Sequence, residues 1–488
     1  MWYVRESFTK LVYPFLLTSS EESGFLEICD AINRTAAETE SPFWREVAIR
    51  DDELDNVIPY VKRYVKRPEN QRRFSVREAW MTSLQAMRTS RMKEDDPAFR
   101  FRAIDLHVFF NGVGFLVFEI EPVYDDALLT IEWVQNVNAD LASLTRGRPL
   151  ERVSTPHSER ESSHDDPYAG SIYVPRTFTM RTLVSRLLDP LMSACRSVKI
   201  DPMVDTFLLA YGAVQLTLED DVPDPDAAFQ SFAAQHLTVL RKTLSAQNSN
   251  HFSQQIFGDP EHNYMPYHNV IHTQSLEGGF VIAYDNGASH FQGRPSAAMA
   301  SFRKHYFLMM LLALHQRMSI LRYATGAADA ALLSERAQKL RALREQIYDF
   351  TSRCYFSQAS ISEERDQLYR RWQRAFNISQ MYDELIEEIH DIDDYLAGVE
   401  RERELATKAQ ELRQDAQRTK LVTYVSFILL PVSILVNLIQ AIPVIQTWWM
   451  HGFLSFRMGA FFALTFVVFI FIIILIISRF ARNHQERR

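Results

Sequence analysis

The chain has 488 residues, 47% of them hydrophobic and 23% charged, so it is long and apolar enough for two or three packed domains. A formal net charge of −8, with lysines and arginines scattered along the sequence, excludes the basic stripe by which proteins collect DNA or RNA. The cysteines Cys29, Cys195 and Cys354 lie far apart and outside any CxxC spacing, which excludes a disulfide framework and a thiolate zinc site.

Residues 1–300 predict a cytosolic α/β domain. Residues 1–20 mix charged and short apolar groups and lack the apolar core of a secretory signal, so we expect no export. The clearest element is a hairpin at 104–121, where runs rich in Val and Phe flank Asn111-Gly112-Val113-Gly114. An exposed insertion is expected at 146–175, which is poor in apolar residues. Further strands are predicted at 10–17, 205–217, 268–273 and 279–284, and helices at 52–64, 126–144 and 227–244.

Residues 301–420 predict a helical stalk. Apolar residues at helical spacing predict helices at 302–323 and 328–356. From 362 to 420 there is no proline and a single glycine, Gly398, which predicts one continuous helix of about 85 Å. Its heptad seam should pack against another helix, and 328–356 is the expected partner. The seam is also expected to hold identical chains together in a ring, along with the first membrane helix. The seam consists of Ile378, Tyr382, Leu385, Ile389, Ile392, Leu396 and Val399.

Residues 421–488 predict two transmembrane helices with a short cytosolic tail. Residues 458–477 carry no charge and span about 30 Å as a helix, which matches one hydrocarbon core. Residues 421–439 are also uncharged and long enough to cross, although Pro431 interrupts them. The connector at 441–457 contains two tryptophans that suit a membrane interface. A buried hairpin of a soluble protein is the alternative.

Basic residues flank the outer ends of the two predicted membrane helices. Positive charge favours the cytosolic side of a membrane, so both termini are expected in the cytosol. The chain is therefore expected to be a multi-pass protein of the cell membrane, with lipid around its membrane helices. The residues concerned are Arg413, Arg418 and Lys420 before the first helix, and Arg479, Arg482, Arg487 and Arg488 after the second.

A cytosolic α/β domain, a long helix entering the membrane and a second C-terminal membrane helix together resemble the CorA family of divalent-cation channels. The segment Phe427-Ile428-Leu429-Leu430-Pro431-Val432-Ser433 is similar to that family's first membrane helix in its apolar run, its proline and its hydroxyl residue two positions later. The family's Gly-Met-Asn signature would fall on Gln440-Ala441-Ile442, which does not match it. The resemblance implies a homo-oligomer of five chains, a pore lined by the first membrane helix, and Mg²⁺ or another divalent cation as substrate or regulator.

The first membrane helix carries a polar stripe. With about 100° between successive residues, its polar side chains fall within an arc of about 100°. Leu430 is the one apolar residue well inside the stripe, and a ring of such side chains could dewet and close a pore. The alternative is that Ser and Thr bond to their own helix and allow close packing. The predicted pore-lining set is Thr419, Thr423, Ser426, Leu430, Ser433, Asn437 and Gln440.

Residues 375–399 contain no Lys or Arg but many carboxylates at helical i, i+3 and i+4 spacing, which destabilise a helix unless something compensates them. We consider three explanations: a solvated acidic face, docking of the basic tail, or a bound divalent cation. The candidate cation ligands are Asp383, Glu387, Asp391 and Asp394. An acidic loop at 219–226 allows the same alternatives.

Catalytic motifs are missing from the sequence, which holds no HExxH, GxSxG, Walker loop or GxGxxG, and we expect no enzyme. His268 and His272 have no further ligand at metal-binding spacing. The main hypothesis is a homo-oligomeric cation channel or transporter regulated by its cytosolic domain. One alternative is a membrane-permeabilising effector triggered by a small molecule or nucleotide, and another is an anchored sensor or scaffold without a pore.

Overall fold

The structure is a computed structural model in which the chain divides into two compact units, Met1–Leu396 and Ala397–Arg488, called here the N-terminal and C-terminal units. The predicted insertion at 146–175 and the second membrane helix at 458–477 lie largely outside the described residues. The described residues are 2–19, 24–38, 43–93, 95–123, 129–145, 147–153, 176–195, 198–218, 222–241, 262–331, 336–450, 461, 464, 466–468 and 470–471.

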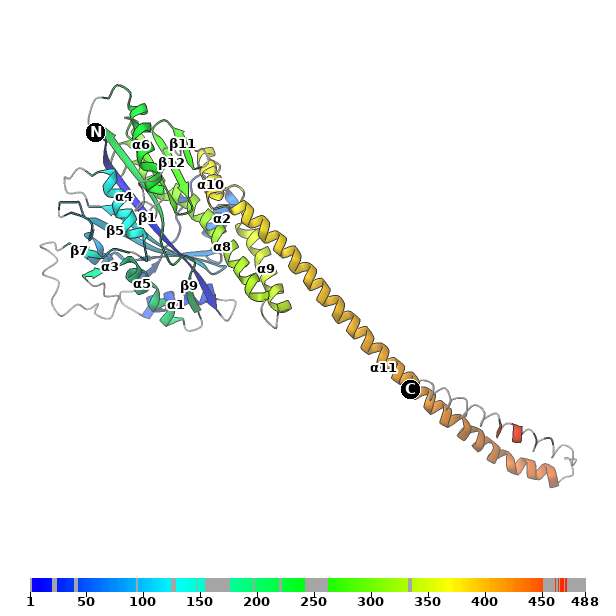
Figure 1. The fold of residues 1–488 in the computed structure, drawn as a ribbon. Coiled ribbons are helices and arrows are strands. Elements are labelled where there is room, and N and C mark those ends of the chain that lie inside the picture. Colours follow the sequence, from blue (N-terminus) through cyan, green and yellow to red (C-terminus); the bar gives the residue numbers. More distant parts are fainter. Residues whose placement is uncertain are drawn as a thin grey trace. The chain divides into compact units, whose positions relative to one another are not determined.

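The N-terminal unit is an α/β domain, as predicted, and it is built on one mixed sheet. Its main path is β11-β12-β13-β10-β1-β6-β5-β4-β7-β8, with β2 and β3 attached beside β5, and β9 beside β1 (Figure 1). Among its described residues, only β10 and β13 pair in parallel. The strands are β1 Trp2–Ser19, β2 Trp44–Glu46, β3 Gln71–Val76, β4 Met87–Thr89, β5 Phe99–Phe109, β6 Val113–Pro122, β7 Leu150–Arg152, β8 Thr177–Phe178, β9 Val198–Pro202, β10 Leu209–Leu218, β11 Asn263–Tyr267, β12 Val270–Ser275 and β13 Gly278–Tyr284.

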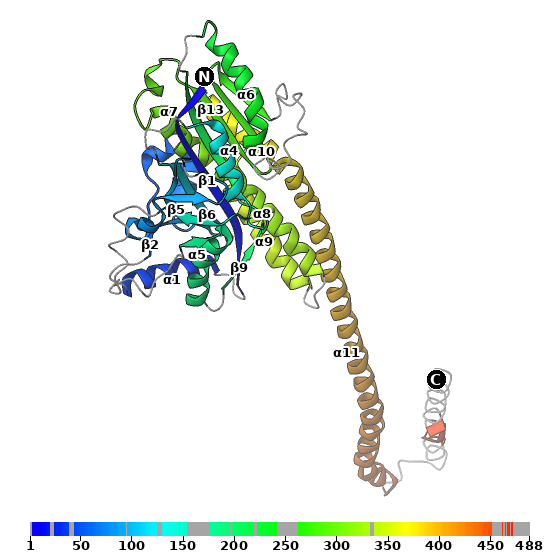
Figure 2. The ribbon, with the colours of Figure 1, turned by 60° about the vertical axis from the view of Figure 1, so that its left-hand side comes forward.

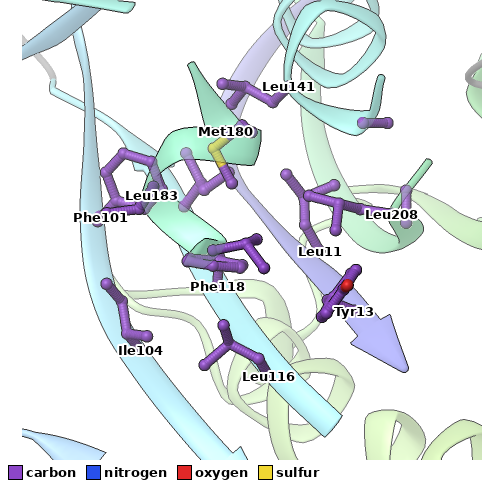
Figure 3. Close-up of a cluster of buried hydrophobic side chains, with 14 of the residues drawn as sticks. Leu11, Tyr13, Phe101, Ile104, Leu116, Phe118, Leu141, Met180, Leu183 and Leu208 are labelled. Atoms are coloured by element: carbon purple, nitrogen blue, oxygen red, sulfur yellow. The ribbon is translucent and has the colours of Figure 1, made fainter. Parts of the chain in front are cut away.

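Helices cover both faces of this sheet, and each face has its own apolar core. Alternation along β1 sends Leu11 and Phe15 into one core and Phe8 and Val12 into the other. The first core lies under α1 Gly24–Glu38, α4 Ile131–Ala142, α5 Met180–Ala194 and α6 Pro225–Arg241, and Figure 3 shows part of it. The second lies under α2 Pro59–Lys66, α8 Phe307–Ala331, α9 Arg336–Cys354, α10 Glu363–Ala375 and the start of α11 Ile378–Met450 (Figure 2).

The predicted hairpin is confirmed as β5 and β6. Gly112 has φ +76° in the connecting turn, which is the left-handed region that favours glycine. Gly114 serves another purpose, because it lies in β6 where an added Cβ would be 2.3 Å from the ring of Phe15. The second glycine of the motif therefore allows close packing of β6 on β1.

The prediction of one continuous helix from 362 to 420 is wrong, because the chain breaks between α10 and α11. Asn377 has φ +55° at this break. Asparagine tolerates the left-handed conformation better than most residues and often ends helices in this way. No proline or glycine marks the position, so the break is not apparent from helix-breaking residues alone.

The heptad seam packs within the chain, as predicted, against α9. Tyr382 stacks on Tyr355 with 3.8 Å between ring centres, and Arg344 of α9 pairs with Asp393 at 2.8 Å. The buried members of the seam are Ile378, Leu385, Ile389, Ile392 and Leu396. Their apolar surface is covered by the same chain and is not free to hold an oligomer together.

Three predicted helix boundaries change. The helix expected at 52–64 is split into η1 Asp51–Leu54 and α2, with Asn56 at φ +60° between them. The helix expected at 302–323 begins with a π-helical turn, η7 Phe302–Tyr306, before α8. The connector expected at 441–457 begins later, because α11 continues through Pro443 to Met450.

The start of β13 requires glycine. Gly278 has φ +141°, and an added Cβ would lie 1.9 Å from the carbonyl oxygen of Ala210 on the parallel neighbour β10. We expect Gly278→Ala to lower the free energy of unfolding by about 3 kcal/mol or more, because backbone strain and a backbone clash add together. At Gly287, φ is +86° and an added Cβ would have no atom within 4 Å, so Gly287→Ala introduces backbone strain without a clash. It should lower the free energy of unfolding by about 1 kcal/mol. Urea unfolding of both variants tests this, and equal losses would contradict it.

Candidate functional site

Helix α11 contains one segment that could cross a membrane. Within 378–437 an 18-residue window has a mean hydropathy of 1.9, and none of that window is buried within the chain. A core helix of a soluble protein can be equally apolar but lies under other elements, whereas side chains such as Leu421 and Val422 are more than 60% exposed here. Such a long exposed apolar surface requires either lipid or partner chains.

The predicted pore-lining residues all lie on α11, along one face of one helix. Two of them bond to their own helix, as the alternative interpretation of the stripe expects. Thr419 Oγ1 donates to the carbonyl of Asp415 at 2.8 Å, and Thr423 Oγ1 donates to the carbonyl of Thr419 at 2.7 Å. Leu430 is 63% exposed. A single chain brings these residues into a line and not around a channel, so a pore needs several copies.

The same face of α11 continues into the charged segment that precedes the apolar one. Leu405 and Leu412 are 65% and 71% exposed, although most of their neighbours in 397–420 are polar. At about 100° per residue they lie within about 40° of Thr419 around the helix axis. The polar stripe and these two leucines therefore share one side of α11.

The acidic candidates show no metal site. Asp383, Glu387, Asp391 and Asp394 are all exposed, and no group of three possible metal-binding side chains occurs among the described residues. In the second acidic segment, 219–221 lie outside the described residues and the rest has structural contacts. Asp224 accepts from the amide of Ala227 at the start of α6, and Asp226 accepts from the hydroxyl of Tyr284.

The other residues singled out from the sequence also have structural places. His268 lies outside β12, whereas His272 is buried on it, stacked on Tyr306 at 5.3 Å, so the two do not share a strand face. The three cysteines are free and buried. Burial raises the pKa of the Cys29 and Cys354 thiols to about 12, so these thiols are poor nucleophiles.

A charged cavity of about 230 Å³ lies in the N-terminal unit. Its floor is formed by inward-facing residues of β1, β3, β5 and β6, and its cover by η1, η7 and the start of α8. Its charged and titratable lining residues are Lys10, Arg50, Glu53, Arg73, Arg102, Asp105, His107, Glu119, Arg303 and Lys304. An apolar wall consists of Ile49, Leu54, Phe307, Leu308 and Leu311.

Two backbone irregularities border this cavity. The register of β5 against β6 shifts between Phe101 and Ala103, so Arg102 lies in a β-bulge. Arg303 and Lys304 lie in the π-helical turn η7. Bulges and π-turns are over-represented beside functional sites, where they redirect side chains.

The cavity's carboxylates are shared among several cations. Glu119 contacts Lys10 at 3.1 Å and Arg303 at 2.8 Å, and Arg102 lies 3.5 Å away. Arg73 bridges Glu53 at 2.8 Å and Asp105 at 3.5 Å. Two cations also lie over aromatic rings, Lys10 over Phe307 and Arg303 over Phe8, at 4.4 and 4.8 Å from the ring centres. These contacts hold the basic groups in place.

The electrostatic surroundings favour a charged Glu121 and a neutral His107. Burial alone would raise the pKa of Glu121, but hydrogen bonds from Arg100 and Arg102 outweigh it and the pKa lies below its ordinary value. Burial first, and then the charges of Arg73 and Lys10, hold the pKa of His107 well below its ordinary value. Asp105 Oδ1 and His107 Nδ1 are buried and have no hydrogen-bond partner.

In comparisons with known proteins, no family model, no curated protein and no solved structure matched this chain.

Proposed function

We propose that the chain is one subunit of a CorA-like homo-oligomeric membrane channel or transporter for cations, with α11 lining the pore and the N-terminal unit regulating it. The observation that carries the proposal is the exposed apolar segment of α11 with its single polar stripe. In a monomer that stripe would face lipid, where polar groups are costly. In a ring of chains it would face water. A second membrane helix at 458–477 and cytosolic termini are parts of the same proposal.

The assembly surface proposed here differs from the heptad seam, which its own chain already covers. We assign the contact between copies to the side of α11 that carries Leu405 and Leu412, continuous with the polar stripe. Five copies is the number that the family resemblance implies.

The proposal predicts that Leu412→Lys weakens assembly. In a ring, the lysines of neighbouring chains would lie close together in the contact between copies. Their repulsion should shift the oligomer towards smaller species. Gln414→Lys adds the same charge on the opposite side of α11 and is the matched control. Native mass measurement in mild detergent distinguishes them. Monomers alone at every concentration of the unmodified chain would count against any pore.

Ion flux from liposomes tests the channel directly. The purified chain should conduct monovalent or divalent cations, and flux should respond to millimolar Mg²⁺ if divalent ions regulate it. An inserted oligomer without flux under any of these conditions would support the anchored sensor instead.

Topology is expected to follow the basic flanks of the two membrane helices. A membrane-impermeant maleimide added outside sealed cells should label a cysteine introduced at Gln446 and not one at Gln485. The buried native thiols should give little background. Labelling at Gln485 in sealed cells would contradict the orientation.

A second candidate function is favoured by the charged cavity. A ligand-triggered effector needs a pocket in its soluble part, and the N-terminal unit has one that is lined by polar and apolar groups. Such a protein would permeabilise the membrane without fine ion selectivity, which fits the missing Gly-Met-Asn signature. Flux that discriminates weakly between ions and dyes would favour this alternative.

A further inference from the structure

We infer that the charged cavity between the sheet and η7 is a binding site for a small phosphorylated molecule. The inference concerns the N-terminal unit alone and stands whether or not α11 forms a pore.

The cavity has room for a small ligand and is built on a rigid floor. Its volume of about 230 Å³ is many times the ~10–15 Å³ that one ordered water needs. The floor is rigid because it lies on four paired strands. The side chains of Lys10 and Glu119 on the floor and of Arg303 in the cover are about nine-tenths buried. The rim is open at Arg50, whose side chain is 64% exposed.

The lining of the cavity is rich in cations. Six Lys or Arg residues but only three carboxylates line the cavity. Glu121 and Asp52 pair with the lining from just outside, which leaves six cations and five carboxylates, and Glu6 also acts electrostatically on Arg102 and Arg303. One carboxylate, Glu119, is shared by Lys10, Arg102 and Arg303. Clustered Arg and Lys side chains with spare donors are the usual partners of phosphoryl oxygens.

The rest of the lining indicates a ligand that has further groups beside a phosphoryl group. Asp105 Oδ1 is a buried acceptor without a partner, and His107 Nδ1 is a second unsatisfied polar atom. Unsatisfied buried polar atoms are costly, so their presence in a site is explained by a ligand that bonds to them. The wall from Ile49, Leu54 and Phe307 offers apolar contact. A ligand with a phosphoryl group, hydrogen-bonding groups and an apolar part would match the basic residues, the two unsatisfied polar atoms and the apolar wall.

The site is linked to the helix that precedes α11. Tyr306 belongs to the same π-helical turn as Arg303 and Lys304, and its hydroxyl donates to Glu364 of α10. Lys304 holds Asp52 of η1 at 2.8 Å, on the other side of the cavity. A ligand that bonds to Arg303 or Lys304 therefore acts on a turn that also holds α10.

Pyrophosphate is the probe, because it carries two phosphoryl groups and fits the cavity without assuming the apolar part. With the full-length chain in detergent, pyrophosphate should raise the thermal unfolding midpoint more than sodium chloride of equal ionic strength. Arg50→Glu and Arg102→Glu should each weaken this binding about tenfold or more, the loss expected when a charge-assisted hydrogen bond is removed and reversed.

Arg63→Glu is the matched control, because Arg63 is exposed on α2 and does not line the cavity. It should leave pyrophosphate binding unchanged. Both rim residues are partly exposed, so their variants should fold, which the unfolding transition without ligand verifies. The inference is overturned if pyrophosphate stabilises no more than salt does, or if all three variants bind it as the unmodified chain does. Neither outcome depends on conductance.

Discussion

Lowering the pH from 7.5 to 5.5 is expected to destabilise the N-terminal unit by about 4 kcal/mol, because three histidines are buried there in the neutral form. His272 lies against Tyr306, and burial, followed by the charge of Arg371, lowers its pKa to about 3. His315 stacks on Phe109 at 4.0 Å, and burial lowers its pKa to about 3. The third is His107 in the charged cavity.

The sign follows from proton binding. An unfolded histidine has a pKa near 6.5, whereas the folded pKa of each of these residues is lower. From pH 6.5 down to the folded pKa the unfolded chain binds one more proton per histidine, so stability falls as the pH falls. At one unit below 6.5 each histidine costs about 1.4 kcal/mol. Burial also lowers the pKa of His236 and of His305, which adds to the loss, whereas burial raises the pKa of Glu6, which opposes it.

A variant isolates the histidine contribution from that of Glu6. His272 Nε2 has no hydrogen-bond partner, so His272→Phe removes the titrating ring while keeping an aromatic ring beside Tyr306. Urea unfolding at several pH values should show a pH dependence smaller by one proton, or about 1.4 kcal/mol less lost at pH 5.5. An unchanged pH dependence would mean that His272 is already protonated or exposed in the folded state.

Sequence patterns were sufficient to predict the elements that depend mainly on residues near one another in the chain. The β5–β6 hairpin follows from two apolar strands around a turn glycine, and the burial of Leu385 and Ile392 follows from heptad spacing. The break at Asn377 was missed because it depends on one residue that helices usually tolerate. The helical pattern alone does not show that Asn377 takes the left-handed conformation in which α10 ends.

The charged cavity was missed for a different physical reason. Asp105 and His107 on β5, and Glu119 and Glu121 on β6, alternate with apolar residues, which is the pattern of a strand with one solvated face. In the fold that face is covered by η7 and α8, about two hundred residues later in the chain. The useful signal was that four such residues occur on two strands paired by the same hairpin. Arg100 on β5 faces Glu121 on β6, and such a pair of opposite charges indicates a buried network as readily as a wet surface.

Replacing Leu430 with serine is expected to open the proposed pore at rest. An apolar ring holds water only marginally because it offers no hydrogen bonds, and an ion there loses more solvation than water does. Leu430 lies inside the stripe from Thr423 to Gln440. Leu430→Ser would complete that stripe, and every 1.4 kcal/mol removed from the barrier raises resting conductance about tenfold. We expect leak current in liposomes and toxicity on expression.

Leu435→Ser is the matched control for this gate. Leu435 is 61% exposed in the single chain, close to the 63% of Leu430, but lies about 140° away around the helix. The two variants lose the same apolar surface to serine, so insertion and oligomer mass should change alike, and only Leu430→Ser should leak. Gln440→Ala, at the other end of the stripe, should alter which ions pass and not the resting leak. If Leu430→Ser inserts and assembles but conducts no more than Leu435→Ser, Leu430 faces a neighbouring helix or lipid. The pore assignment would then be abandoned in favour of the anchored sensor.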